Sequence, residues 1–149
     1  MTDFLTRTLR GLALVAAVVL LPLTAAAEVH RVAFQVNDND PRRMNLVLNN
    51  VNNVINYYQS QGDEVEIQIV AYGPGLHMLR ADTSPVAPRI SSMSLEHGNI
   101  QFQACNNTIH GMQRQSGTEV TLLPEAEIVP AGVIHLISLQ EQGWSYIRP

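Results

Sequence analysis

Apolar and polar positions change along the chain in a way that predicts alternating strands and helices. Residues 29–36 form a short, mostly apolar run rich in β-branched side chains, which predicts a buried strand. A polar segment breaks this run, and apolar side chains then recur at spacings of three and four, which predicts a helix with one buried face. We expect Asp40 to cap this helix, Pro41 to take its first position and Gly62 to end it.

The same kind of pattern continues to the C-terminus. Residues 64–71 alternate between apolar and polar side chains, which predicts a second strand with one less buried face. The other predicted elements are the first turns of a helix at 76–80, a short helix from Pro88 or Arg89 to Gly98, a strand at 100–104, a helix from Asn106 or Asn107 to Gln115 closed by Gly117, extended segments at 119–123 and 126–129, an amphipathic helix at 131–142 stopped by Gly143, and a last strand at 144–147.

Repeated strand, turn and helix in a chain of this length imply βαβ crossovers. We therefore predict an α/β fold with three α/β/α layers and a mainly parallel sheet of about five strands. Ligands of such sheets gather beyond the carboxyl ends of the strands, close to helix N-termini. Three segments are expected to meet at that edge, namely 37–40, 72–77 and 105–108.

Residues 1–27 have the composition of a signal peptide. Arg7 and Arg10 give a positive start, residues 11–23 form a short apolar run, and alanines follow where a signal peptidase cuts. A membrane anchor needs about 20 apolar residues, so we expect cleavage and a periplasmic or secreted domain of residues 28–149 with no membrane segment.

Charge excludes some functions. The chain has a net charge of −4, and all nine of its basic residues are arginine. Phosphate binding requires clustered positive charge, so we expect no nucleic-acid partner. The absence of lysine excludes Schiff-base chemistry and a lysine-dependent phosphate loop.

Cys105 is the only cysteine, so it has no partner within the chain for a disulfide. A strand is predicted to end beside it and a helix to begin after it, and a helix start favours thiolate over thiol. We expect Asn106 or Asn107 to cap this helix through a side-chain oxygen. The alternative is that Cys105 is a small buried hydrophobic residue.

Other candidates lie at the same edge. His77 follows the glycine turn and either orients a substrate or acts as a base beside the cysteine, or else faces solvent at a helix start. Gly73 and Gly75 form a tight turn that lacks the third glycine of a dinucleotide fingerprint. Asn37 lies in the loop after the first strand. The five histidines include no pair at i, i+4 spacing, so we expect neither a metal nor another cofactor.

Four stretches resemble the exported branch of the DsrE/DsrF-like family: residues 102–108 (FQACNNT), 72–75 (YGPG), 129–133 (VPAGV) and 139–147 (LQEQGWSYI). The resemblance covers nearly all of the expected mature domain. It implies a small α/β domain that assembles into trimers or hexamers. It also implies a cysteine, here Cys105, that holds a persulfide and passes sulfur between a donor and an acceptor protein, which makes it a carrier rather than a turnover enzyme in the strict sense.

Two functions follow from these observations. The first is an exported sulfur carrier or sulfur-transfer protein that holds a persulfide on Cys105, supported by Asn106, Asn107, Gly73, Gly75, His77 and Asn37. The second is a non-catalytic module that binds a small ligand or assembles into oligomers, with Cys105 in a structural role. Rapid modification of the native protein by a thiol reagent favours the first, and labelling only in denaturant favours the second.

Overall fold

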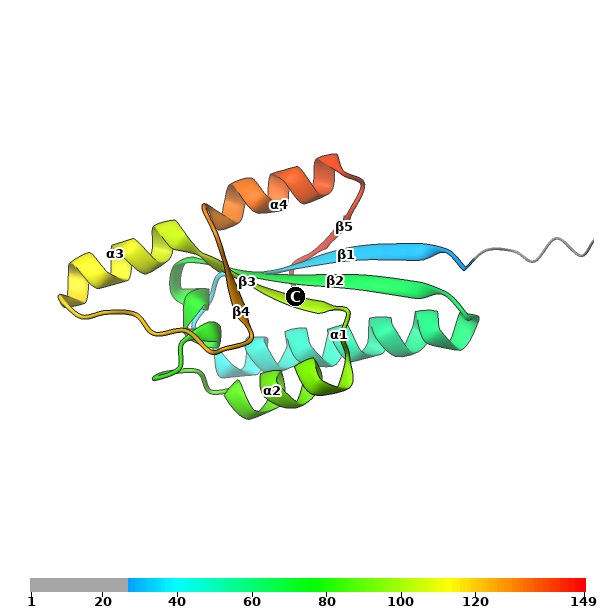
Figure 1. The fold of residues 1–149 in the computed structure, drawn as a ribbon, viewed down its shortest axis with the longest axis horizontal. Helices are drawn as coiled ribbons and strands as arrows, with labels where there is room; N and C mark the ends of the chain where they lie inside the picture. The colour runs from blue at the N-terminus through cyan, green and yellow to red at the C-terminus, as the bar shows by residue number, and fades with distance from the viewer. Residues whose placement is uncertain (1–26) are drawn as a thin grey trace, which may run out of the picture.

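The computed structural model describes residues 27–149, and in that part of the chain five strands form one parallel sheet (Figure 1). Their order across the sheet is β4-β3-β2-β1-β5. The strands are β1 (Val29–Val36), β2 (Glu64–Ala71), β3 (Ile100–Cys105), β4 (Ala126–Val129) and β5 (Ser145–Ile147). The predicted α/β fold with a parallel sheet is confirmed. The predicted signal peptide lies outside the described residues, apart from Ala27.

Helices cover the two faces of the sheet unequally. They are α1 (Pro41–Gln61), the 3-10 helix η1 (Gly73–Leu79), α2 (Ala87–Glu96), α3 (Asn106–Ser116) and α4 (Gly132–Glu141). Figure 1 shows α1 and α2 on one side of the sheet, α4 on the other, and α3 extending past the sheet edge. None of these helices is long and apolar enough to cross a membrane.

The first helix follows the predicted signals. The Asp40 side chain accepts a hydrogen bond of 2.8 Å from the Arg42 amide, and Pro41 occupies the first turn. Gly62 ends the helix in the left-handed region, with φ of 80°. Both predicted boundaries of α1 are therefore confirmed, because each depends on a local cap that the sequence displays.

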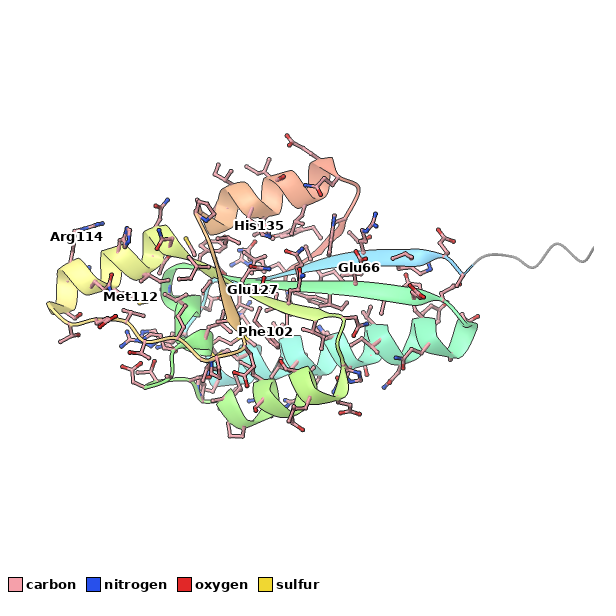
Figure 2. The ribbon with its side chains drawn as sticks, in the orientation of Figure 1. Glu66, Phe102, Met112, Arg114, Glu127 and His135 are labelled. Atoms are coloured by element: carbon pink, nitrogen blue, oxygen red, sulfur yellow. The ribbon has the colours of Figure 1, made fainter. Side chains whose placement is uncertain are left out.

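The large hydrophobic core lies on the face that α1 and α2 cover. A much smaller cluster, made of Ala33, Val70, Leu136 and Leu139, lies under α4. The α4 face also holds polar contacts: Nε2 of His135, which Figure 2 labels beneath α4, lies 2.6 Å from Gln68 Oε1. Burial lowers the pKa of His135.

The prediction that the last helix is amphipathic is wrong. Leu136 and Leu139 of α4 are buried, but its outer side exposes Val133, Ile134 and Ile137. The helix is therefore apolar on both sides.

Two further predictions need correction. The glycine turn and residues 76–79 form the single 3-10 helix η1 rather than the start of an α-helix, and Arg80 is its extended C-cap residue. Residues 119–123 lie outside the sheet, where the Leu123 amide donates to Leu79 O at 2.8 Å and a single bridge joins Leu122 to Arg80. This segment bonds to the end of η1, so its backbone groups do not need a place in the sheet.

Candidate thiolate site

The three segments predicted to meet at the carboxyl edge of the sheet do meet there. The Gly73 amide, at the start of η1, donates a 2.9 Å hydrogen bond to Thr108 Oγ1 on α3. The Tyr72 amide donates to Val36 O, at the end of β1, at 3.1 Å. The backbone of η1 thus joins the loop after β1 to the first turn of α3.

Both glycines of the turn have a local reason to be glycine. A Cβ on Gly75 would lie 2.2 Å from Val36 O and 2.7 Å from Asn37 Cα, so no larger residue fits without moving the backbone. Gly73 has φ of 53°, a conformation that L side chains rarely adopt. Gly73, Gly75 and Asn37 therefore hold the site together through the main chain.

Cys105 lies where two helices begin. It is the last residue of β3 and the N-cap residue of α3. In the parallel register it pairs with Val129, the last residue of β4, so the start of α4 lies beside it. A Cβ on Gly132 would lie only 3.3 Å from Cys105 Cβ and 3.0 Å from Tyr72 Cβ. The absence of a side chain at Gly132 lets α4 approach the cysteine closely.

Cys105 is 5% exposed, and its surroundings are polar on the side of the helix starts. Burial alone raises the pKa of its thiol. Hydrogen bonding to the Thr108 side chain and to the amides of Gly132, Thr108 and Asn107 outweighs burial, so the pKa is lowered from its ordinary value. The amide groups come from the first turns of both α3 and α4, where they have no partner within the helix. The site therefore stabilises a thiolate.

Tyr72 borders the same site, and its pKa is shifted in the opposite direction. Burial raises the pKa of the Tyr72 phenol, the nearby groups Tyr146, Asp38 and Cys105 raise it further, and Arg148 opposes them. Tyr72 is therefore a neutral hydroxyl at ordinary pH. It provides a polar but uncharged neighbour for a negatively charged sulfur.

The predicted cap of α3 is wrong. Neither Asn106 nor Asn107 is the N-cap residue, and no side-chain oxygen caps the helix. The N-cap position belongs to Cys105, since the strand passes directly into the helix without a connecting residue. Asn107 still contributes to the site, through its amide rather than through its side chain.

His77 is not paired with the cysteine. Its Nδ1 lies 2.7 Å from Thr83 Oγ1, and the ring lines a cleft between η1 and α3. The groups that shift the pKa of Cys105 are amides and a hydroxyl, and His77 is not among them. The structure therefore gives no geometry for a Cys105–His77 base pair.

Three residues near the sulfur were not among the predicted site residues, although the first two lie in segments predicted to meet at this edge: Tyr72, Thr108 and Gly132. Thr108 occupies the third position of α3, where the amide and the side chain can both reach the N-cap residue. Predicting that Gly132 lies near Cys105 requires knowing that β4 lies next to β3, which the order of the elements along the chain does not reveal. A glycine at the start of a predicted helix was the available signal.

A metal centre finds no support in the described part of the chain. Within residues 27–149 no group of three or more His, Cys, Asp and Glu side chains is placed to hold an ion. The polar groups around Cys105 are donors to an anion, which differ from the ligands that a cation needs.

Known proteins share this architecture. The model of the DsrE/DsrF-like family matches residues 30–149. A solved structure, that of MTH1491 from Methanobacterium thermoautotrophicum, a protein of unknown function, is 34% identical and aligns with a TM-score of 0.67. That match covers 80% of this chain and 99% of the other. No curated protein matches the chain.

Proposed function

We propose, given that the chain belongs to the DsrE/DsrF-like family, that it is a sulfur carrier that holds sulfane sulfur as a persulfide on Cys105. The single observation that supports this most strongly is the position of the Cys105 thiol beside the first turns of both α3 and α4, where the nearby amides lower its pKa. A thiolate is the nucleophilic form of cysteine, so this environment favours attack on sulfur.

The proposed step conserves atoms and charge. The Cys105 thiolate attacks the terminal sulfur of an inorganic polysulfide, and a new S–S bond forms at Sγ. The S–S bond behind that terminal sulfur breaks, and the shortened polysulfide leaves with the electron pair. The persulfide that remains carries a negative charge, and the amides of Thr108 and Gly132, which lower the pKa of the Cys105 thiol, support the stabilisation of that charge.

The alternative function, a binding or assembly module with a structural cysteine, is favoured by the burial of Cys105. Burial in an inert site, however, is expected among aliphatic side chains and raises the pKa of a thiol. Here the pKa is lowered. We therefore prefer the carrier over the structural role.

Intact mass after exposure to inorganic polysulfide tests the proposal. The mature protein should gain sulfur that a reductant removes, and Cys105→Ala should gain none. Unchanged mass in the wild-type protein, or the same added mass in Cys105→Ala, would contradict the carrier function. Circular dichroism of both proteins controls for folding.

We further propose that the carrier is a homo-oligomer that associates through the outer side of α4. Val133, Ile134 and Ile137 are exposed there, and Ile128 on the edge strand β4 is 60% exposed. Such a patch is typical of protein interfaces. Sedimentation velocity should show an oligomer for the wild-type protein and a smaller species for Ile134→Glu. A monomeric wild-type protein would contradict this assembly.

The expected export is likewise a proposal. Ala27 and Glu28 are exposed and immediately precede β1, so cleavage between them would leave the fold intact. The mass of the protein recovered after expression with its leader should correspond to a chain that begins at Glu28. A protein that retains residues 1–27 would contradict cleavage.

A further inference from the structure

A cleft of about 720 Å³ lies between η1 and α3. Arg80 lines it at the end of η1, and Thr108, Gly111 and Met112 line it from α3. It opens at the carboxyl edge of the parallel sheet, where ligands of α/β folds bind. Its volume is within the range of small-molecule sites.

Gly111 keeps this cleft open and has no packing reason to be glycine. A Cβ there would meet no atom within 4 Å, and Gly111 is not among the glycines with positive φ. Glycine in a helix interior costs about 1 kcal/mol relative to alanine. The missing side chain therefore preserves open space in the cleft at a cost to the stability of α3.

Thr108 connects the cleft to the cysteine. It lines the cleft, its hydroxyl accepts the Gly73 amide at 2.9 Å, and it lies in the first turn of α3, which directly follows the N-cap residue Cys105. A molecule in the cleft therefore lies against the first turn of α3, the helix whose N-cap residue is Cys105.

The cleft offers hydrogen-bond donors to its occupant, among them one guanidinium nitrogen of Arg80, whose charge is already paired with Asp82. Arg80 Nε and Nη2 bond to Asp82 at 2.9 and 2.5 Å, while Nη1 faces only the Met112 sulfur, at 3.7 Å. A thioether is a weak acceptor, so a carboxylate would be a better partner for Nη1. Gln115 and Ser116 add amide and hydroxyl groups to the wall. This set suits a small organic molecule with carboxylate and amide groups.

We propose that the cleft binds the organic part of a low-molecular-weight persulfide, which is the sulfur donor to Cys105. This inference rests on the proposed carrier function and names its donor class. The Cys105 thiolate attacks the outer sulfur of the donor, RSSH, forming an S–S bond at Sγ. The S–S bond of the donor breaks, and the thiol RSH leaves with the electron pair and the proton.

Filling the cleft from Gly111 tests this assignment. Gly111→Leu places a side chain in open space at a helix position where leucine is favoured over glycine, so folding should be preserved. Loading of Cys105 is followed by intact mass, with glutathione persulfide and inorganic polysulfide as separate donors. The rate of loading from glutathione persulfide, divided by the rate of loading from polysulfide, should fall about tenfold in Gly111→Leu, which corresponds to about 1.4 kcal/mol.

Gln113→Leu is the matched control, since it adds the same side chain to α3 at a residue outside the cleft lining. Its rate ratio should equal that of the wild-type protein. An unchanged ratio in Gly111→Leu, or an equal fall in both variants, would overturn the proposal.

A second measurement separates this proposal from the carrier function. S-methylglutathione cannot transfer sulfur, and its binding to Cys105→Ala is followed by NMR shifts of the Gly111 and Gln115 amides. Amide shifts in Cys105→Ala that disappear in the double variant Cys105→Ala with Gly111→Leu support the cleft as the binding site. The absence of any shift in Cys105→Ala overturns the proposal that the cleft binds the organic part of the donor. If neither donor loads the wild-type protein, the carrier function fails, and this titration alone decides the role of the cleft.

Discussion

The helices α1 and α3 both follow a strand of the same parallel sheet, yet their first turns are capped by different atoms. At α1 a carboxylate oxygen of Asp40 accepts the Arg42 amide. At α3 the N-cap residue is Cys105, which makes no capping hydrogen bond through its side chain, and the nearby amides of Asn107 and Thr108 lower the pKa of its thiol. The cap of α1 stabilises its helix, whereas the free amides at the start of α3 lie near a thiol.

The difference lowers the stability of α3 and lowers the pKa of the Cys105 thiol. A side-chain oxygen at the N-cap contributes about 1 kcal/mol to helix stability, and α3 lacks one. This helix is also poorly anchored, because Ile109 is its one buried residue. In exchange, amides without a partner in the helix lower the pKa of the thiol, and Gly132 adds an amide from a second helix start.

Replacing the sulfur at the start of α3 with an oxygen has the largest expected effect, which is on sulfur loading. Cys105→Ser replaces the sulfur with a good N-cap oxygen, so sulfur loading should be abolished while stability is kept or raised by up to about 1 kcal/mol. Intact mass after polysulfide and urea denaturation measure the two quantities. A variant that still gains sulfur would show that Cys105 is not the acceptor.

The next largest effect is expected from a substitution in η1, which joins the loop before α1 to the first turn of α3. Gly75→Ala forces a Cβ to within 2.2 Å of Val36 O, and such crowding should destabilise the fold by about 1 to 3 kcal/mol. Gly111→Ala is the control, because its Cβ meets open space and should stabilise α3 by up to about 1 kcal/mol. Equal denaturation midpoints for the two variants would contradict the packing of η1.

Removing the oxygen cap of α1 gives a smaller change. Asp40→Ala should lower the free energy of unfolding by about 1 kcal/mol without changing the thiol pKa, since Asp40 serves α1 alone. Urea denaturation and the pH dependence of thiol alkylation measure these two properties. A change in the pH midpoint of alkylation would mean that the two helix starts are coupled.

Thr108→Val has the smallest expected effect, which is on the thiol, and it also leaves the Gly73 amide without its hydroxyl acceptor. It keeps the shape of the side chain but removes the hydroxyl that helps to lower the pKa of Cys105. The pKa should therefore rise towards its ordinary value. The stabilisation from a depressed pKa is present above the unfolded-state pKa and is lost as pH falls through the folded-state value. Thr108→Val should reduce this dependence of stability on pH, as denaturation at several pH values would show.

Sequence patterns predicted most of the fold because its elements are signalled locally. The caps of α1, the glycine that ends α3 and the alternating side chains of β2 all depend on neighbours in the chain. The apolar outer side of α4 was misjudged, because the sequence does not say which apolar side chains face the sheet and which remain exposed.

The site was only partly predictable for a related reason. The edge of the sheet and the place of Cys105 at a strand end followed from the α/β pattern. The amide of Gly132 reaches the cysteine because β4 pairs with β3, with Val129 beside Cys105. That pairing is long-range, so no local signal reveals it. The same holds for the contact between Gly73 and Thr108.

The pH dependence of Cys105 alkylation by iodoacetamide is the most direct test of the account. Rates are measured for the native protein and for the same protein unfolded in urea, with Cys105→Ser as the blank. A stabilised thiolate predicts that the native rate reaches half its plateau at a lower pH than the unfolded rate. A native midpoint equal to or above the unfolded one, or labelling only after unfolding, would contradict the claim that the two helix starts activate this sulfur.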